Sequence, residues 1–155
     1  MKKSAPKTVL LVPFSSEDAS RTRIWKHVKR WLQQTLDAPM YIGEHIPEQP
    51  ALYNLSLARN DAAWQAGDDW DVAIIHDADT VINPQQIEAG VQVALETGAV
   101  TYPYTERWEL DFEGTSMLLE DESSDWQSHM QQYVRNQPLG GCIIVRRDLW
   151  DLVRG

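Results

Sequence analysis

Two short apolar runs, TVLLVPF (8–14) and DVAIIHD (71–77), constrain the fold of this chain more than any other feature. Each has the length of a strand, and neither alternates polar with apolar residues. Such runs are typical of strands that are buried on both faces, as in parallel sheets covered by helices. The intervening segments have the apolar spacing of helices. The sequence therefore predicts an α/β fold, a three-layer α/β/α sandwich with a mainly parallel sheet.

Local start and stop signals predict the helices. A helix start is marked by Ser, Thr, Asn or Asp just before a segment whose apolar residues recur at helical spacing. A helix end is marked by a Gly just after that segment. An Asn-Pro pair is an especially clear start, because Pro is favoured at the first helical position. Five helical segments are expected. The first begins at Ser15 or Ser16, the second covers 55–67 and ends at Gly67, and the third runs from Asn83-Pro84 to Thr97-Gly98. The fourth covers 124–137, and the last is a helical turn at the end of the chain.

The remaining strands are expected at 40–43, at 99–104 and after the glycine pair near residue 140. The acidic segment 106–125 has no apolar period, so it is expected to be a long loop or an irregular hairpin.

The composition limits the class of protein. At 155 residues the chain has the length of one domain, and no apolar stretch reaches the length of a membrane helix. The lone cysteine, Cys142, has small and apolar neighbours, and we expect it in the core of a cytoplasmic protein. The net charge of −9 argues against general nucleic-acid binding. Residues 1–30 are nevertheless basic, so a local anion site there stays open.

Asp77 and Asp79 close the second apolar run and are the first candidates for chemistry. In open α/β sheets ligands bind beyond the carboxyl ends of the strands, where these two acids fall. Side chains at i and i+2 can point the same way, so the pair predicts a Mg²⁺ or Mn²⁺ site. The alternative is turn chemistry, in which each Asp accepts hydrogen bonds from nearby backbone N–H groups. His76 should point away from Asp77, into the core or a supporting position.

Two blocks of the sequence resemble GT-A glycosyltransferases. SLARNDAAWQAGDDWDVAIIHDADTVINPQQIEAG (56–90) is similar to the central block of that family, in which an Arg-Asn helix precedes the strand that carries the D-x-D motif. PLGGCIIVRRDLWDLVRG (138–155) is similar to the later glycine-rich block. The resemblance is strongest to the family-2-like and galactosyltransferase-like enzymes, and it implies one GT-A domain over residues 1–155.

The resemblance implies that a UDP- or GDP-linked sugar binds over the strand ends and that its sugar passes to an acceptor hydroxyl. It implies Asp79 as the principal metal ligand, and Asp77 as a contact to the ribose or, through water, to the metal. Arg59 is equally compatible with a helix surface, and the glycine pair with a tight turn. The other donor-binding residues implied are Pro13, Phe14, Arg21, Glu44, Arg59, Asn60, Gly140 and Gly141.

The resemblance fails at the catalytic base. Inverting members of the family place this base just after the glycine-rich block, where this sequence stops. Asp111 and Glu113 are the only suggestive candidates within the chain. We therefore expect the chain to be a piece of a longer enzyme that lacks its C-terminal part.

Two other functions stay open. DADTV (77–81) also fits the first motif of haloacid dehalogenase-type phosphatases, with Asp77 as nucleophile and Asp79 as acid/base, although the last lysine, Lys29, lies far upstream. The other alternative is a non-catalytic module that binds a nucleotide-sugar or a metal. The acceptor is not readable: a glycan, a metabolite, a protein and a modified base in DNA all remain, the last suggested only by the basic N-terminal helix and not by the net charge.

Overall fold

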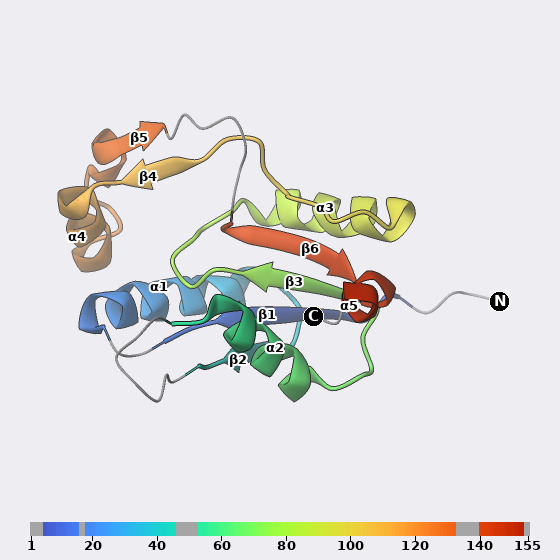
Figure 1. Ribbon diagram of the computed structural model, residues 1–155. Coiled ribbons are helices and arrows are strands. Elements are labelled where there is room, and N and C mark those ends of the chain that lie inside the picture. The colour runs from blue at the N-terminus through green and yellow to red at the C-terminus, as the bar shows by residue number, and fades with distance from the viewer. Residues whose placement is uncertain (1–4, 16–17, 46–52, 133–139, 154–155) are drawn as a thin grey trace.

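A four-stranded sheet with strand order β2-β1-β3-β6 forms the centre of the computed structural model, which describes residues 5–15, 18–45, 53–132 and 140–153 (Figure 1). The predicted α/β class and mostly parallel sheet are confirmed. β1 pairs in parallel with β2 and β3, whereas β6 pairs antiparallel with β3. The strands are β1 (Thr8–Pro13), β2 (Met40–Gly43), β3 (Val72–His76) and β6 (Cys142–Arg146).

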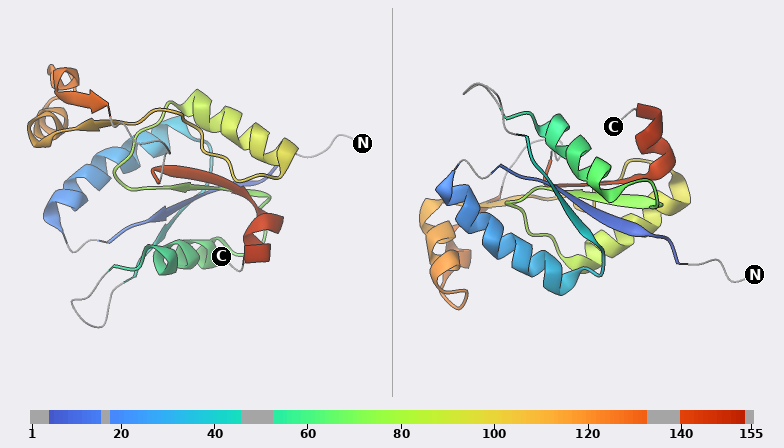
Figure 2. Two further views of the ribbon diagram at one scale, coloured as in Figure 1. Left: turned by 45° about the horizontal axis from the view of Figure 1, so that its top comes forward. Right: turned by 90° about the horizontal axis from the view of Figure 1, so that it is seen from below.

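Helices cover both faces of this sheet, which explains why its strands are apolar without alternation. α1 and α3 lie on one face, and α2 and α5 lie on the other (Figure 2). Leu10 and Ile74 point to the first face, and Leu11 and Ile75 point to the second, so each strand supplies both halves of the core. The helices are α1 (Ala19–Thr35), α2 (Leu55–Ala66), α3 (Pro84–Thr97) and α5 (Arg147–Val153).

Most predicted helix ends are confirmed. α3 begins at Pro84 with Asn83 as its N-cap and ends at Gly98, which is left-handed with φ +70°. Gly67 caps the end of α2. The start of α1 was predicted wrongly: Asp18 is the N-cap, and its carboxylate accepts the backbone N–H of Ser20 at 2.7 Å. Ser15 does not cap the helix, and Ser16 lies outside the described residues.

The predicted strand at 99–104 is wrong in extent. Only Thr101 pairs with the sheet, through two backbone hydrogen bonds to Ile144 of 2.8 and 2.9 Å. Pro103 lies against α3, where a Cβ placed on Gly90 would come within 3.1 Å of the Pro103 Cβ. Packing on α3 therefore leads the chain away from the sheet edge.

The acidic segment is more ordered than the sequence predicts. It contains β4 (Trp108–Leu110) and α4 (Phe112–Glu120), followed by a 3-10 turn (Trp126–His129) and β5 (Met130–Gln132). β4 and β5 pair antiparallel, so the predicted helix over 124–137 is wrong as far as residue 132, and residues 133–137 lie outside the described residues. Glu122 joins this unit to α1 by an ion pair of 3.0 Å with Arg30.

Two smaller expectations concern the membrane and Cys142. No helix in the described ranges is both long and apolar enough to cross a bilayer. Cys142 is buried as predicted, and burial raises the pKa of its thiol to about 12, so the group stays protonated.

Candidate functional site

The carboxyl ends of β1, β2 and β3 meet at one edge of the sheet, because the three strands are parallel (Figure 1). β6 runs the opposite way and begins at the same edge, just after Gly140 and Gly141. Asp77 follows β3 directly. The topology thus brings the D-x-D triplet and the glycine pair together, although they are 64 residues apart in the chain.

Asp77 joins the end of β3 to the beginning of β6. Its Oδ2 accepts the Gly141 N–H at 2.8 Å, and its own backbone N–H donates to the Gly141 carbonyl at 2.8 Å. Its Oδ1 lies 3.5 Å from the Nη2 of Arg59. Both carboxylate oxygens therefore have protein partners, and part of the turn chemistry considered as an alternative is present at Asp77.

The glycine pair needs glycine at both positions. Gly140 has φ +95° and Gly141 has φ +81°, which are conformations that L side chains rarely adopt. A Cβ on Gly141 would lie 3.0 Å from the hydroxyl of Tyr104, and that hydroxyl donates to the Gly140 carbonyl. The pair thus makes a tight turn whose backbone lies next to Asp77.

Asp79 has a different environment from Asp77. The residue is exposed, whereas Ala78 between the two acids is buried. Its Oδ1 accepts a long hydrogen bond of 3.4 Å from the neighbouring Thr80 hydroxyl. Within the described ranges, no three His, Cys, Asp or Glu side chains are arranged to hold a metal ion. One exposed carboxylate nevertheless fits Mg²⁺ or Mn²⁺, which keep several waters and take other ligands from substrate phosphates.

Arg21 and Tyr53 form a second pair near the Arg59–Asp77 pair. Arg21, at the start of α1, has its guanidinium carbon 5.9 Å from the centre of the Tyr53 ring. Burial raises the pKa of Tyr53, and the charges of Arg21, Asp77 and Arg59 also act on it, so all three lie within electrostatic range of its hydroxyl.

Two polar atoms of this cluster lack partners. The Tyr53 hydroxyl and the Arg59 Nε are both buried without a hydrogen bond from any residue that the structure describes. A buried donor without a partner is costly, so a ligand that supplies acceptor oxygens would be stabilised here. Phosphate oxygens have the charge and geometry that arginine prefers. Tyr53 was not found from the sequence, since it belongs to no helical or strand period.

The other predicted donor residues do not share one environment. Pro13 and Phe14 are buried at the end of β1, and the Phe14 ring packs against Trp25 at 5.5 Å between ring centres. Glu44 follows β2 at the same edge with an exposed side chain, and its N–H donates to Asp61 at 3.0 Å. Asn60 lines a pocket with Trp64 on the α2 side of the sheet.

Asp111 and Glu113 belong to α4. Asp111 is the N-cap of that helix, and its Oδ1 accepts the Gly114 N–H at 2.8 Å. Its Oδ2 lies 3.1 Å from the Nδ1 of His129. The Gly114 N–H and His129 lower the pKa of Asp111, which makes it a weaker base, and they assign it a capping role. Glu113 lies in the first turn of the same helix.

Comparison with known proteins does not add to this picture. No protein-family model matches the chain. A search of the curated proteins finds no match either. The functional argument therefore rests on the geometry of the site.

His76 supports the site from within the core, as predicted. The side chain is fully buried, its Nδ1 lies 2.8 Å from the Asp77 carbonyl, and its ring lies 6.1 Å from that of Trp31. Burial lowers the pKa of His76, and the nearby charges of Asp77 and Asp79 offset this only in part. The folded protein therefore holds His76 neutral at a pH where a free histidine takes up a proton.

This predicts a pH dependence of stability. Below a pH of about 6.5 the unfolded chain protonates His76 while the folded chain does not, so the free energy of unfolding should fall as pH falls. The contribution of one such group is at most about 1.4 kcal/mol per pH unit. Urea unfolding of the wild type and of His76→Gln between pH 7 and 5 checks this. The variant should show the shallower slope, and equal slopes would contradict the prediction.

Proposed function

We propose that the chain is a metal-dependent glycosyltransferase with a GT-A arrangement, a three-layer α/β/α sandwich. It binds a UDP- or GDP-linked sugar with Mn²⁺ or Mg²⁺ at the carboxyl edge of the sheet and transfers the sugar to an acceptor hydroxyl. The observation that carries the proposal is that the Arg59–Asp77 pair lies at that edge, with the Arg21–Tyr53 pair within electrostatic range and Asp79 exposed two residues after Asp77.

The cationic side supports the binding of a diphosphate. Arg59 is largely buried, with 21% of its side chain exposed, and its pairing with Asp77 uses only one corner of the guanidinium. The Arg59 Nε and the Tyr53 hydroxyl are buried without a hydrogen-bond partner among the described residues, and phosphate oxygens that reach them would satisfy both. The chain as a whole carries a charge of −9, so arginines gathered at one edge differ from the rest of the molecule and favour an anionic ligand there.

The acidic side supports a bound cation. Asp79 would hold Mn²⁺ or Mg²⁺, and Asp77, whose oxygens are engaged by Gly141 and Arg59, would contribute charge or a water-mediated contact. When bound, the metal stabilises the negative charge that develops on the departing diphosphate.

The same geometry favours the phosphatase alternative less. A nucleophilic Asp77 needs a carboxylate oxygen free to attack phosphorus, whereas Oδ2 accepts a backbone hydrogen bond and Oδ1 pairs with Arg59. The non-catalytic module shares every contact of the proposed site, so turnover is what separates it from the enzyme.

Turnover of nucleotide-sugars tests the proposal. UDP- and GDP-sugars are incubated with the protein in Mn²⁺, and release of UDP or GDP is measured with and without EDTA. We expect slow, metal-dependent hydrolysis of at least one donor, because water can replace the acceptor. Binding without release would favour the non-catalytic module, and release of phosphate from p-nitrophenyl phosphate that is lost in Asp77→Asn would favour the phosphatase.

A further inference from the structure

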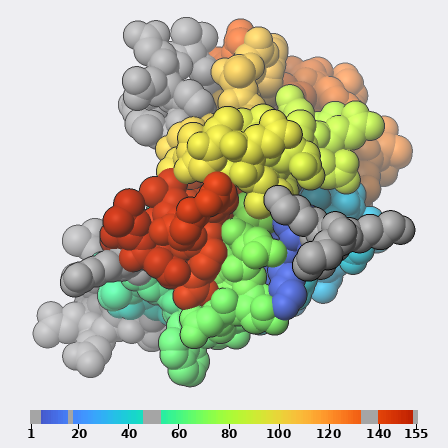
Figure 3. All heavy atoms as spheres, turned by 90° about the vertical axis from the view of Figure 1, so that its right-hand side faces the viewer, coloured from blue at the N-terminus to red at the C-terminus, as the bar shows by residue number. Residues whose placement is uncertain are grey.

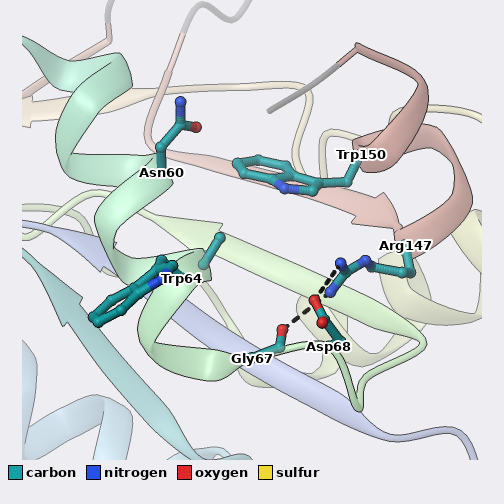
Figure 4. Close-up of a pocket in the computed structure, with 7 residues that line it drawn as sticks. Asn60, Trp64, Gly67, Asp68, Arg147 and Trp150 are labelled. Carbon is teal, nitrogen blue, oxygen red and sulfur yellow. Dashed lines mark hydrogen bonds and ion pairs between the residues drawn. The ribbon is translucent and has the colours of Figure 1, made fainter.

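A second pocket lies on the other face of the sheet, between α2 and α5. It has a volume of about 280 Å³ and is lined by Asn60, Ala63, Trp64, Asp68, Arg147 and Trp150, with Gly67 at its base (Figure 4). The segment before β3 and helix α5 meet at the end of the sheet opposite the D-x-D triplet (Figure 3). β3 spans about 15 Å between the two ends, which separates the Asp68 and Arg147 end of the pocket from Asp77.

Trp150 and Trp64 both line this pocket, and the Trp64 ring points away from Trp150 toward solvent (Figure 4). Trp64 is 80% exposed, which is unusual for so large an apolar side chain. Trp150 extends from α5 toward α2 across the pocket (Figure 4). Flat aromatic faces with solvent access suit ligands that have one apolar face and a polar rim.

The Trp150 wall is rigid. Its ring makes an edge contact with the buried Trp70 at 6.4 Å, and the Trp70 Nε1 donates to the Gly67 carbonyl at 2.9 Å. The Arg147 guanidinium lies 4.7 Å from the centre of the Trp70 ring. A wall held in this way loses little conformational entropy when a ligand binds.

The charges around the pocket select against anions. Arg147 donates to Asp68 at 2.8 Å, to Asp151 at 2.8 Å and to the Gly67 carbonyl at 3.0 Å, so each of its three guanidinium nitrogens has a partner. Two carboxylates surround this one cation. Asp68 is 96% exposed and keeps acceptor capacity at the rim, and Asn60 adds an amide that can donate and accept.

We infer that this pocket binds a neutral pyranose ring of a carbohydrate. The apolar C–H face of the ring lies on an indole, and its hydroxyl groups bond to Asn60 and Asp68. The volume is near the lower limit for ligand pockets, which fits one sugar ring better than a nucleotide. Of the residues that the resemblance implies for the donor, this pocket uses only Asn60, and the inference stands without the proposed transfer reaction.

Indole NMR signals test the inference. Cellobiose, maltose and lactose are titrated into ¹⁵N-labelled protein, and the Nε1 signals are assigned with Trp→Phe variants. We expect at least one of these sugars to shift the Trp64 and Trp150 signals saturably, with a dissociation constant in the millimolar range. Trp64→Ala should weaken binding by about tenfold or more and keep the fold, since its ring is exposed. Trp108→Ala removes another exposed indole, 51% accessible, and should leave binding unchanged.

Three results would overturn the inference. The first is that none of the three sugars moves the Trp64 and Trp150 signals. The second is that choline moves them more strongly than any sugar, which would identify a site for cations. The third is that dilution of the protein alone moves them, which would identify an interface between copies of this chain. Asp79→Ala should bind the sugar as the wild type does, so failure at the donor site is distinguishable from failure here.

Discussion

Asp79→Ala is expected to abolish the dependence of nucleotide binding on Mn²⁺ while leaving the fold intact. The side chain is exposed and, within the part of the chain that the structure describes, makes only the long contact with Thr80, so the free energy of unfolding should change by less than about 0.5 kcal/mol. The affinity for UDP or GDP in Mn²⁺ should fall by about 100-fold, equivalent to about 2.7 kcal/mol. Calorimetric titration with Mn²⁺ and with EDTA measures both affinities.

Two variants serve as controls for this result. Asp69→Ala removes the same charge from an exposed position before β3 and should keep the metal dependence. Asp77→Ala should instead destabilise the fold by about 1 to 3 kcal/mol, because it leaves the Gly141 N–H and Arg59 without their partner. If Asp79→Ala binds nucleotide in Mn²⁺ as tightly as Asp69→Ala, the metal assignment is wrong.

Gly43→Ala is expected to unfold the protein or to destabilise it by about 4 kcal/mol or more. A Cβ at this position would lie 1.8 Å from the Ala58 carbonyl oxygen and 2.6 Å from the Ala62 nitrogen. Both atoms belong to the backbone of α2, so no side chain can move aside. Thermal and urea unfolding measure the loss.

Gly98→Ala is the matched control. Gly98 is left-handed with φ +70°, and its Cβ would meet only the end of the Arg146 side chain at 3.4 Å. The cost should be about 1 to 2 kcal/mol, from the backbone conformation alone. Because Arg59 follows Ala58 on α2, the Gly43 contact also fixes the position of Arg59 at the site. Equal losses for the two variants would mean that α2 does not lie against β2 at this distance.

The parts of the fold that depend on local signals could be predicted. The central strands could be identified because burial on both faces makes them uniformly apolar. The start of α3 could be identified because Asn83 caps the helix and Pro84 occupies its first turn. α4 was missed because its stability does not come from an apolar stripe: Phe112 is 87% exposed, and the helix depends on the Asp111 cap and on Gly114 lying against His129. β5 was mistaken for helix because its pairing with β4 is a long-range contact.

The candidate site likewise has a part that local sequence patterns predict and a part that depends on long-range packing. Asp77 and Asp79 were chosen from their place after an apolar strand, where topology gives ligand sites, and the glycine pair was implied by the resemblance. That Asp77 pairs with Arg59 while Asp79 stays exposed depends on how α2 packs on the sheet, which no local pattern contains. Tyr53 joins them through the same packing.

A crystal structure with Mn²⁺ and UDP or GDP tests the central claim most directly. Anomalous scattering from Mn²⁺ should place the ion next to the Asp79 carboxylate, with diphosphate oxygens between it and Arg59. A cation bound elsewhere, or a diphosphate out of reach of both Arg59 and the Tyr53 hydroxyl, would contradict the account.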